Sequence, residues 1–454
     1  MPSQIPFGYS LLRRFVRFWI NRFFRQIRIQ GTANVPEGPV IFAMNHPNNF
    51  IDSLMMSYAI ERKIHYLATS QMFRNKLLAL FLHNAGVIPV YRKQDDASHS
   101  EKNIGTFQAC YDVLRDGGAI GIYPEGTTHS EPRVKRIKTG AARIALEAEQ
   151  QFSVGVKIVP VGLNFFARKS FRGEVLVSIG APLEAADYLA GYPSQPVTAV
   201  DQLTSHLQDA MEEEILHVDA PELDQLVNEI AEIYKGELIR DLVEVGMAPE
   251  EVDRFRISKK LVEGIHFFNK RDPVRLRRVL DGVRRYQSRL RKAHLQDSLL
   301  HQMVGKRSSY FAFVFRVLLL VVSFPVALWG GINHFLPYLI TRRISRKVAK
   351  KETDYATARI LSGIIFYTLF YAAQIYWVLR QFGPFVAAIY GGTLPLFGAF
   401  AYYYWDKIRI VSGDLQLFWM MLTRKRLLDQ LQQMRAELIA QMDQAKEDYL
   451  QQAM

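Results

Sequence analysis

The last third of the sequence contains apolar runs long enough to span a membrane. Residues 360–379 (ILSGIIFYTLFYAAQIYWVL) hold no charged side chain, and residues 382–405 form a second run that ends in the aromatic cluster YYYW. As a helix, each run would cross about 30 Å of hydrocarbon, with Tyr and Trp at the interface, where these residues are enriched. Only Arg380 and Gln381 separate the two runs. We therefore expect two membrane spans that form a hairpin.

A further apolar segment, residues 310–339, is interrupted by Pro325 and by a Gly-Gly pair. If this segment crossed once, the stretch 341–351, which is rich in Lys and Arg, would lie across the membrane from the N-terminal part of the chain. Basic loops favour the cytosolic side. We therefore expect a re-entrant hairpin of two short arms, with one full crossing as the alternative. The predicted membrane domain covers residues 306–410.

The segment after the membrane domain, residues 411–454, is predicted to be helical. Leu and Met recur there at three- and four-residue spacing among Gln and charged side chains, which is the pattern of an amphipathic helix. Such a helix either forms a coiled coil between copies of the chain or packs as a cap on the protein itself. Both interpretations, the homo-oligomer and the cap, stay open.

The chain has a net charge of +13, which indicates an anionic partner: nucleic acid, a membrane surface or a phosphorylated substrate. Residues 1–30 predict a basic amphipathic helix that suits the plane of an anionic bilayer; packing on the domain is the other interpretation, and the two are compatible. Residues 196–305 are predicted to be charged and mostly helical, with ten Lys or Arg against two Asp in residues 269–292. That helix face is either solvated or in contact with lipid. Because the basic residues flank membrane segments, we expect anionic lipid as the partner and no nucleic acid.

Residues 31–195 alternate short β-rich runs with helical segments, which is typical of an α/β domain with a central sheet flanked by helices. The predicted strands are residues 39–44, 64–69, 86–91, 119–124, 157–165 and 174–180. The predicted helices are residues 51–62, 72–83, 99–115 and 138–150. The single cysteine, Cys110, lies in one of these helices and fits a reducing compartment or a cytosolic face.

A histidine and an aspartate follow the first predicted strand, in the stretch AMNHPNNFID. His46 would lie in a turn at the carboxyl end of the strand, where α/β folds place their ligands, and Asp52 near the start of the next helix. From that turn, Nδ1 of His46 could meet the carboxylate of Asp52, which would leave Nε2 to accept a proton from a hydroxyl. Taken alone, the spacing fits a structural histidine better than a catalytic one.

Carboxylate and basic side chains follow other predicted strands. Glu125 comes directly after one strand and Arg92 after another, and Arg133 and Lys138 lie near the start of a predicted helix. A base, a carboxylate and several cations at one sheet edge are the groups expected where a hydroxyl beside a phosphate is deprotonated. The sequence has no Gly-x-Ser-x-Gly motif and no Gly-rich Lys-Ser/Thr loop for phosphate.

Together these blocks resemble the glycerolipid acyltransferases, the family that includes glycerol-3-phosphate and lysophosphatidate acyltransferases. The family's four motif blocks stand here, in the family's order, as NHPNNFID, GVIPVYR, YPEGTTHSEP and IVPVGLN. The resemblance covers roughly residues 30–185. Five residues separate His46 from Asp52, where the family usually has four. With the C-terminal membrane segments, this looks more like the fungal-type glycerol-3-phosphate/dihydroxyacetone-phosphate acyltransferases than the short bacterial lysophosphatidate enzymes.

Two positions depart from the family's pattern. Tyr123 replaces the usual Phe, and Thr128 stands where an arginine often follows Glu-Gly-Thr. The second change shifts the binding of a phosphate to Arg92, Lys138 and Arg133.

The resemblance implies direct acyl transfer without a covalent intermediate, with His46 as the general base and Asp52 as the residue that orients it. The substrate-binding residues that it implies are Asn45, Arg92, Glu125, Gly126, Thr127 and Lys138. We expect no metal, since no histidines have the spacing of metal ligands, and no cofactor beyond acyl-CoA or acyl carrier protein as the co-substrate.

The expected function is that of a membrane-bound transferase in phospholipid synthesis. It would move a fatty acyl group from an acyl thioester to a hydroxyl of glycerol 3-phosphate or dihydroxyacetone phosphate. Transfer to 1-acyl-glycerol 3-phosphate (lysophosphatidate) is the alternative; a catalytically silent scaffold of the same fold and a lipid hydrolase are less favoured. We expect an integral protein of the bacterial inner membrane or the endoplasmic reticulum, with a cytosol-facing active site.

Overall fold

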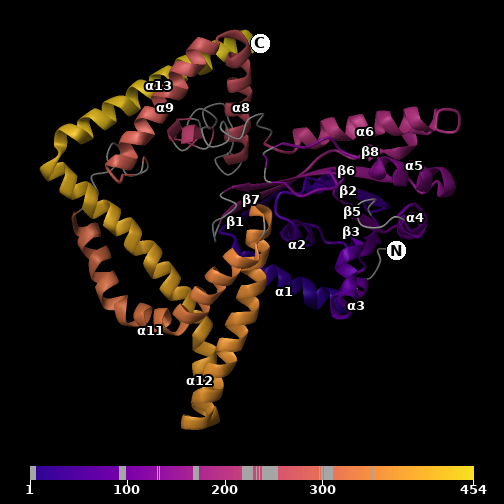
Figure 1. Ribbon diagram of the computed structural model, residues 1–454. Coiled ribbons are helices and arrows are strands. Elements are labelled where there is room, and N and C mark those ends of the chain that lie inside the picture. Colours follow the sequence, from indigo (N-terminus) through magenta and orange to yellow (C-terminus); the bar gives the residue numbers. More distant parts are fainter. Residues whose placement is uncertain are drawn as a thin grey trace. The chain divides into compact units, whose positions relative to one another are not determined.

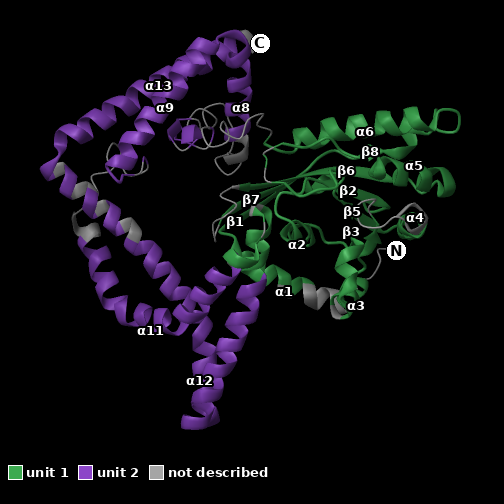
Figure 2. Cartoon of the chain, in the orientation of Figure 1, with its two compact units in different colours: residues 1–219, 346–360 green, residues 220–345, 361–454 purple. Residues whose placement is uncertain are grey.

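The computed structural model describes most of the chain. The residues that it describes are 7–91, 99–129, 131, 133–166, 173–216, 227, 229–231, 233, 234, 236, 237, 254–295, 297, 300, 310–349 and 351–453. The chain divides into two compact units (Figure 2). Unit 1 comprises residues 1–219 and 346–360, and unit 2 comprises residues 220–345 and 361–454.

Unit 1 contains an eight-stranded sheet with the strand order β1-β7-β6-β2-β5-β3-β4, and β8 pairs with β6 (Figure 1). The strands are β1 (Gln26–Gln30), β2 (Val40–Met44), β3 (Ile64–Thr69), β4 (Ile88–Val90), β5 (Ala119–Ile122), β6 (Lys157–Phe166), β7 (Glu174–Ile179) and β8 (Leu183–Glu184). Neighbours are parallel from β6 to β4, and β7 is antiparallel to β6. The central strand β2 is buried at every position. Its unbroken apolar sequence is that of a parallel strand covered on both faces.

Helices cover both faces of this sheet. Those that lie wholly in unit 1 are α1 (Phe7–Phe23), α2 (Phe50–Ala59), α3 (Lys76–Asn84), α4 (His99–Arg115), α5 (Gly140–Phe152) and α6 (Pro196–Glu213). Ile41 and Ala43 of β2 belong to one core cluster, with side chains of α4, α5 and α6. Val40 and Phe42 belong to the other, with side chains of α1 and α2. The alternation of side chains along β2 therefore separates the two cores.

The six predicted strands form, but two predicted boundaries are wrong. Residues 26–30, expected to end the N-terminal helix, form β1, whose two isoleucines pack against the core. Helix α6, expected in the charged region 196–305, belongs to unit 1. Leu203 and Leu207 are buried in the same core cluster as α5, and this packing joins α6 to the α/β fold.

Helix α1 packs against the core of unit 1, as one of the two interpretations of this segment expects. Ile20 and Phe23 are buried in the core. Nη2 of Arg13 and Nη1 of Arg17 lie 3.2 Å and 3.4 Å from Oε1 of Glu61, just beyond α2. Two arginines of this basic segment thus pair within the protein.

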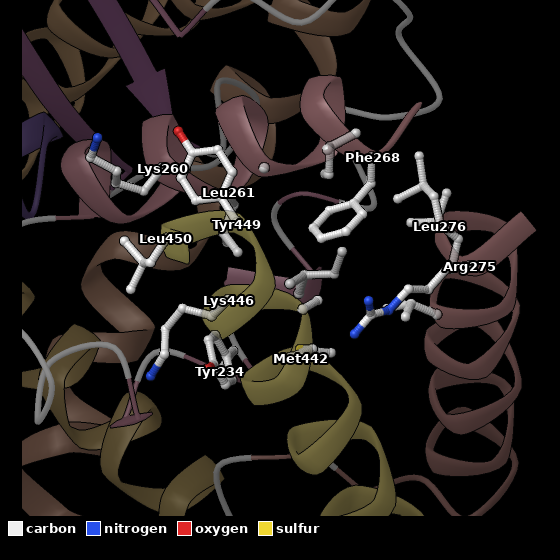
Figure 3. A pocket seen from close by; sticks show the side chains of 16 residues that line it. Tyr234, Lys260, Leu261, Phe268, Arg275, Leu276, Met442, Lys446, Tyr449 and Leu450 are labelled. Carbon is white, nitrogen blue, oxygen red and sulfur yellow. The ribbon is translucent and has the colours of Figure 1, made fainter. Parts of the chain in front are cut away.

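In unit 2, the C-terminal helix packs on two helices of the middle region. These helices are α8 (Arg254–Arg271), α9 (Pro273–Lys292) and α13 (Lys425–Ala453). The buried apolar side chains of α13 are Leu428, Leu431, Leu438 and Met442, and Arg275 of α9 pairs with Asp448 of α13. The three helices line a cavity of about 400 Å³ (Figure 3). The apolar stripe of the tail therefore serves as a cap on the chain's own helices.

Two long apolar helices, α11 (Tyr310–Val348) and α12 (Tyr355–Thr423), lie between α9 and α13 in the sequence. α11 is one continuous helix, with no break between the two predicted arms. Pro325 and Pro337 lie inside it, and its ribbon bends along its length (Figure 1). Bending is the usual response of a helix to internal proline, which removes a backbone hydrogen bond.

α12 reverses direction at Gly383, whose φ of 83° is not helical. Gly391 approaches the side chain of Ile375, and these residues are equally far from Gly383 in the sequence. The two arms are therefore antiparallel, as predicted for a membrane hairpin.

α11 contacts both arms of α12. Asn333 accepts hydrogen bonds from Nε2 of Gln374 (3.1 Å) and from the hydroxyl of Tyr390 (2.6 Å). Within the described residues, α11 and α12 contain the candidate membrane spans, Val314–Val348 and Tyr355–Gly413. The second is long enough to cross a bilayer twice.

Candidate active site

The polar residues of the predicted site follow strands that end at one edge of the sheet. His46 lies just after β2, and Glu125 lies just after β5. Since β2, β5, β3 and β4 run parallel, their carboxyl ends lie together, at the edge where α/β sheets bind ligands. The backbone N–H of His129 donates to the carbonyl oxygen of His46 (3.3 Å) and joins the two loops.

His46 and Asp52 are in direct contact. Nδ1 of His46 lies 2.8 Å from Oδ2 of Asp52, and the same oxygen accepts a hydrogen bond from the backbone N–H of Asn48 (2.9 Å). The Asp52 side chain is fully buried, whereas that of His46 is 16% exposed. With the proton on Nδ1 directed at the carboxylate, the imidazole presents Nε2 as a proton acceptor. This arrangement has the geometry of a general base.

Tyr123 stacks on the imidazole and fixes its plane. The two rings are 3.8 Å apart and 17° from parallel, and the hydroxyl of Tyr123 lies 2.8 Å from Oγ of Ser53 in α2. Phenylalanine, the usual residue in the family, could stack but could not make this hydrogen bond. Burial, together with the charge of Asp52, raises the pKa of Tyr123 well above its ordinary value. The phenol is therefore neutral beside the His46–Asp52 pair.

Glu125 forms a second buried pair with His129, which sequence reasoning did not identify as a site residue. Oε2 of Glu125 contacts Nε2 of His129 and accepts a hydrogen bond from the backbone N–H of Lys135 (2.9 Å). Glu125 thus orders the loop that follows β5. The spacing of four residues was the available signal for His129, but it is ambiguous outside a helix. Within the described residues, no cluster of His, Cys, Asp or Glu side chains could hold a metal ion.

Gly126 leaves room for Lys138. A Cβ at Gly126 would lie 2.6 Å from Nζ of Lys138, and the φ of Gly126, +68°, is one that other residues rarely adopt. The backbone N–H of Lys138 donates to the carbonyl of Pro124 (2.9 Å). Lys138 and Thr127 are both exposed. The loop therefore holds an accessible cation and an accessible hydroxyl next to Glu125.

The other predicted substrate-binding residues are placed differently. The amide of Asn45 donates to the carbonyl of Leu163 (3.2 Å) and accepts from its N–H (2.7 Å). Asn45 thus fastens the turn after β2 to β6, and this pairing gives no support to a substrate-binding role. Arg92 lies outside the described residues. Arg133 pairs with Glu131, which favours a structural role for that cation.

A segment far along the sequence also contacts the turn at His46. Nδ2 of Asn49 donates to Oδ1 of Asp354 (3.0 Å), and Oγ1 of Thr357 donates to the carbonyl of Asn48 (3.3 Å). Asp354 and Thr357 lie between the two candidate membrane spans or at the start of the second. No sequence signal pointed to them, because about 300 residues separate them from the motif.

The raised pKa of Tyr123 predicts a pH dependence of stability. An unfolded tyrosine loses its proton near pH 10, whereas Tyr123 in the folded protein keeps it. Above pH 10 the folded state therefore binds more protons than the unfolded state, and the free energy of unfolding falls as pH rises. In Tyr123→Phe this contribution is absent. The melting temperature, measured from pH 8 to 11, should fall more steeply with pH in the wild type than in Tyr123→Phe. Parallel plots of melting temperature against pH would contradict the prediction.

Comparison with known proteins places part of the chain in a family. Residues 26–164 match the family model described as Acyltransferase. Over 436 residues the chain is 24% identical to glycerol-3-phosphate O-acyltransferase 1 of Saccharomyces cerevisiae, which covers 76% of this chain and 56% of that protein. Over 451 residues it is 23% identical to an uncharacterized acyltransferase of Schizosaccharomyces pombe, with 79% and 65% covered.

A shorter match is to a bacterial protein. Over 172 residues the chain is 27% identical to 1-acyl-sn-glycerol-3-phosphate acyltransferase of Bacillus subtilis, with 37% of this chain and 79% of that protein covered. The chain thus spans about half to two-thirds of the length of the two yeast proteins. The family match contains His46, Asp52, Tyr123, Glu125, Gly126 and Lys138. Residues 26–164 are an acyltransferase-family domain.

Proposed function

We propose that this chain is a membrane-bound acyltransferase that moves a fatty acyl group from an acyl thioester to a hydroxyl of glycerol 3-phosphate or dihydroxyacetone phosphate. The observation that carries the proposal is the contact between His46 and the buried Asp52 at the carboxyl edge of an acyltransferase-family sheet. The name of the S. cerevisiae relative supports glycerol 3-phosphate as the acceptor.

The geometry supports a direct transfer. Nε2 of His46 takes the proton of the acceptor hydroxyl as the oxygen attacks the thioester carbonyl. The new ester C–O bond forms, the C–S bond breaks, and the proton passes from the imidazole to the leaving thiolate. Asp52 holds the ring and stabilises the imidazolium. Acyl-CoA or acyl carrier protein is the donor in this scheme, and no further cofactor takes part.

The acceptor phosphate is assigned to Lys138, with Arg92 as a second cation. Lys138 is exposed and lies over Gly126, one residue from Glu125. Lysophosphatidate carries the same phosphate, so it is the second candidate acceptor. The name of the B. subtilis relative favours it, although that match covers only 37% of this chain.

The catalytic pair predicts a specific loss of activity. His46→Ala should lower the turnover number by about 10²–10⁴-fold, the usual contribution of a general base, and Asp52→Asn should lower it strongly through loss of ring orientation. Thiol release from palmitoyl-CoA measures this, with glycerol 3-phosphate, dihydroxyacetone phosphate and lysophosphatidate offered in parallel. Near-normal turnover in folded His46→Ala would overturn the mechanism, and the preferred acceptor separates the two candidate functions.

The phosphate assignment predicts a change confined to one substrate. Lys138→Ala should raise the KM for the phosphorylated acceptor about tenfold, as expected for the loss of a charge-assisted bond, and leave the KM for the acyl donor unchanged. Arg136→Ala is a matched control, because Arg136 is an exposed neighbour on the same loop. Equal effects on donor and acceptor would instead place Lys138 at the phosphates of CoA.

Contacts between helices support a membrane topology. The two arms of α12 are antiparallel, so both ends of α12 lie on one side of the membrane. α13 follows α12 and packs on α9, which puts α9 on that side as well. α11 begins after α9 and ends where α12 begins. We therefore propose that α11 enters and leaves the membrane on the same side, as the re-entrant interpretation requires.

Charge supports the cytosolic side as the common side. The exposed cations of α9 include Arg277, Arg278, Arg284, Arg285 and Arg289, and the basic stretch 341–351 follows α11. Basic segments favour the cytosolic face and its anionic lipids. A water-soluble thioester would then reach the site from the cytosol.

Single cysteines in a Cys110→Ala background test this topology. They are placed at exposed positions: Asp281, Lys351, Gln381 and Ala436. In sealed vesicles of known orientation, a membrane-impermeant maleimide should label 281, 351 and 436 from one side and 381 from the other. Labelling of 281 and 351 from opposite sides would show that α11 crosses fully.

A further inference from the structure

We infer that residues 351–357, which join the two candidate membrane spans, hold the catalytic turn (residues 46–49) in its active conformation, with Asp354 and Thr357 as positioning residues. The inference rests on the proposed function, because positioning has meaning only if the His46–Asp52 pair is catalytic. It extends that function to a part of the chain outside the acyltransferase-family domain.

The backbone conformation of Asn49 must be stabilised by contacts with other parts of the chain. Its φ of 53° and ψ of −128° lie in a region that residues with a side chain rarely adopt. Such conformations persist where the surrounding structure enforces them, often at functional sites. An asparagine at the start of a helix usually accepts a hydrogen bond from an N–H of that helix, but Asn49 makes no such bond. Its amide donates to Oδ1 of Asp354 instead (3.0 Å).

Asn48 links the supporting segment to the His46–Asp52 pair by hydrogen bonds. Its N–H donates to Oδ2 of Asp52, the same oxygen that Nδ1 of His46 contacts. Its carbonyl accepts from Oγ1 of Thr357 (3.3 Å). Residues 351–357 therefore bind the turn at two successive residues, and a shift of the turn would remove a donor from the Asp52 carboxylate. The five residues between His46 and Asp52 make this turn long, which increases its need for support.

The supporting segment is itself embedded in unit 1. Thr353 and Ala356 are each 4% exposed, and Ala356 belongs to the core cluster that contains Ile51 and Met55 of α2. The segment begins between the candidate spans Val314–Val348 and Tyr355–Gly413 and ends in the first residues of the second. The turn that carries the general base is thus fastened to the connection between the membrane helices.

The test uses the full-length protein in membranes, with acyl transfer as the readout. Asp354→Ala should lower kcat about tenfold to hundredfold, which is the range for loss of a hydrogen bond to a charged group. The KM values for donor and acceptor should stay nearly unchanged, because neither Asp354 nor Asn49 is assigned to a substrate. Asp354→Asn keeps an oxygen that can accept from Asn49 and should retain most of the activity. Thr357→Val should lower kcat, whereas Thr357→Ser, which keeps the hydroxyl, should not.

A matched control and a double-mutant cycle separate positioning from simple destabilisation. Lys347 is exposed and lies just before the supporting segment, so Lys347→Ala should retain wild-type kcat. If Asp354 acts through Asn49, Asp354→Ala should add little to Asn49→Ala, because their effects are coupled. Asn49→Gly should be more active than Asn49→Ala, since glycine adopts the required backbone conformation without strain. Additive effects in the cycle, or a wild-type kcat in Asp354→Ala, would overturn the inference.

The same assay distinguishes this failure from a failure of the proposed function. A wild type without acyl transfer to any of the three acceptors would refute the function itself. A wild type that is active, loses activity in His46→Ala and keeps it in Asp354→Ala would refute only the positioning role.

Discussion

The buried carboxylate of Asp52 is the group on which the arrangement of the site depends. A carboxylate removed from water costs several kcal/mol unless hydrogen-bond donors replace the lost hydration. Here the donors are Nδ1 of His46 and the N–H of Asn48. The imidazole and the turn are therefore fixed by the same requirement. The sheet supplies the rest of the frame, because Asn45 fastens the turn to β6 and Tyr123 stacks on the ring from the end of β5.

Much of unit 1 could be predicted from the sequence because parallel strands buried on both faces leave a plain signal. The run VIFAM predicts β2 directly, and the motif blocks fall at the ends of strands, as they must to meet at one edge. The strand β1 was missed, since QIRIQ follows a basic helix without a break in composition. α6 was assigned to the wrong region because its charged residues resemble those of the region that follows. Its membership of unit 1 depends on the packing of Leu203 and Leu207 against α5, which the sequence does not indicate.

The site was predictable to a lesser degree. The meeting of His46 with Asp52 follows from a strand, a turn and a helix start, all local in the sequence. The side-chain amide of Asn45 forms hydrogen bonds with the backbone of the neighbouring strand β6. Nothing in the motif distinguishes this structural role from binding a ligand. His129 and Asp354 were missed for a similar reason. Each acts through a partner whose proximity depends on the loop conformation or on a contact between segments far apart in the chain.

Unit 1 is discontinuous in the sequence: residues 1–219 need residues 346–360 to complete it. During synthesis the sheet and its motif loops leave the ribosome first, and α11 must follow before Asp354 and Thr357 exist. At roughly 5–20 residues per second, synthesis of the residues from 219 to 354 takes about 7–27 s. During that interval the nascent chain contains His46 and Asp52 but not yet residues 351–357, which contact the turn between them. The contacts of Asp354 and Thr357 with the turn therefore form only after the first long apolar helix, α11, has been synthesised.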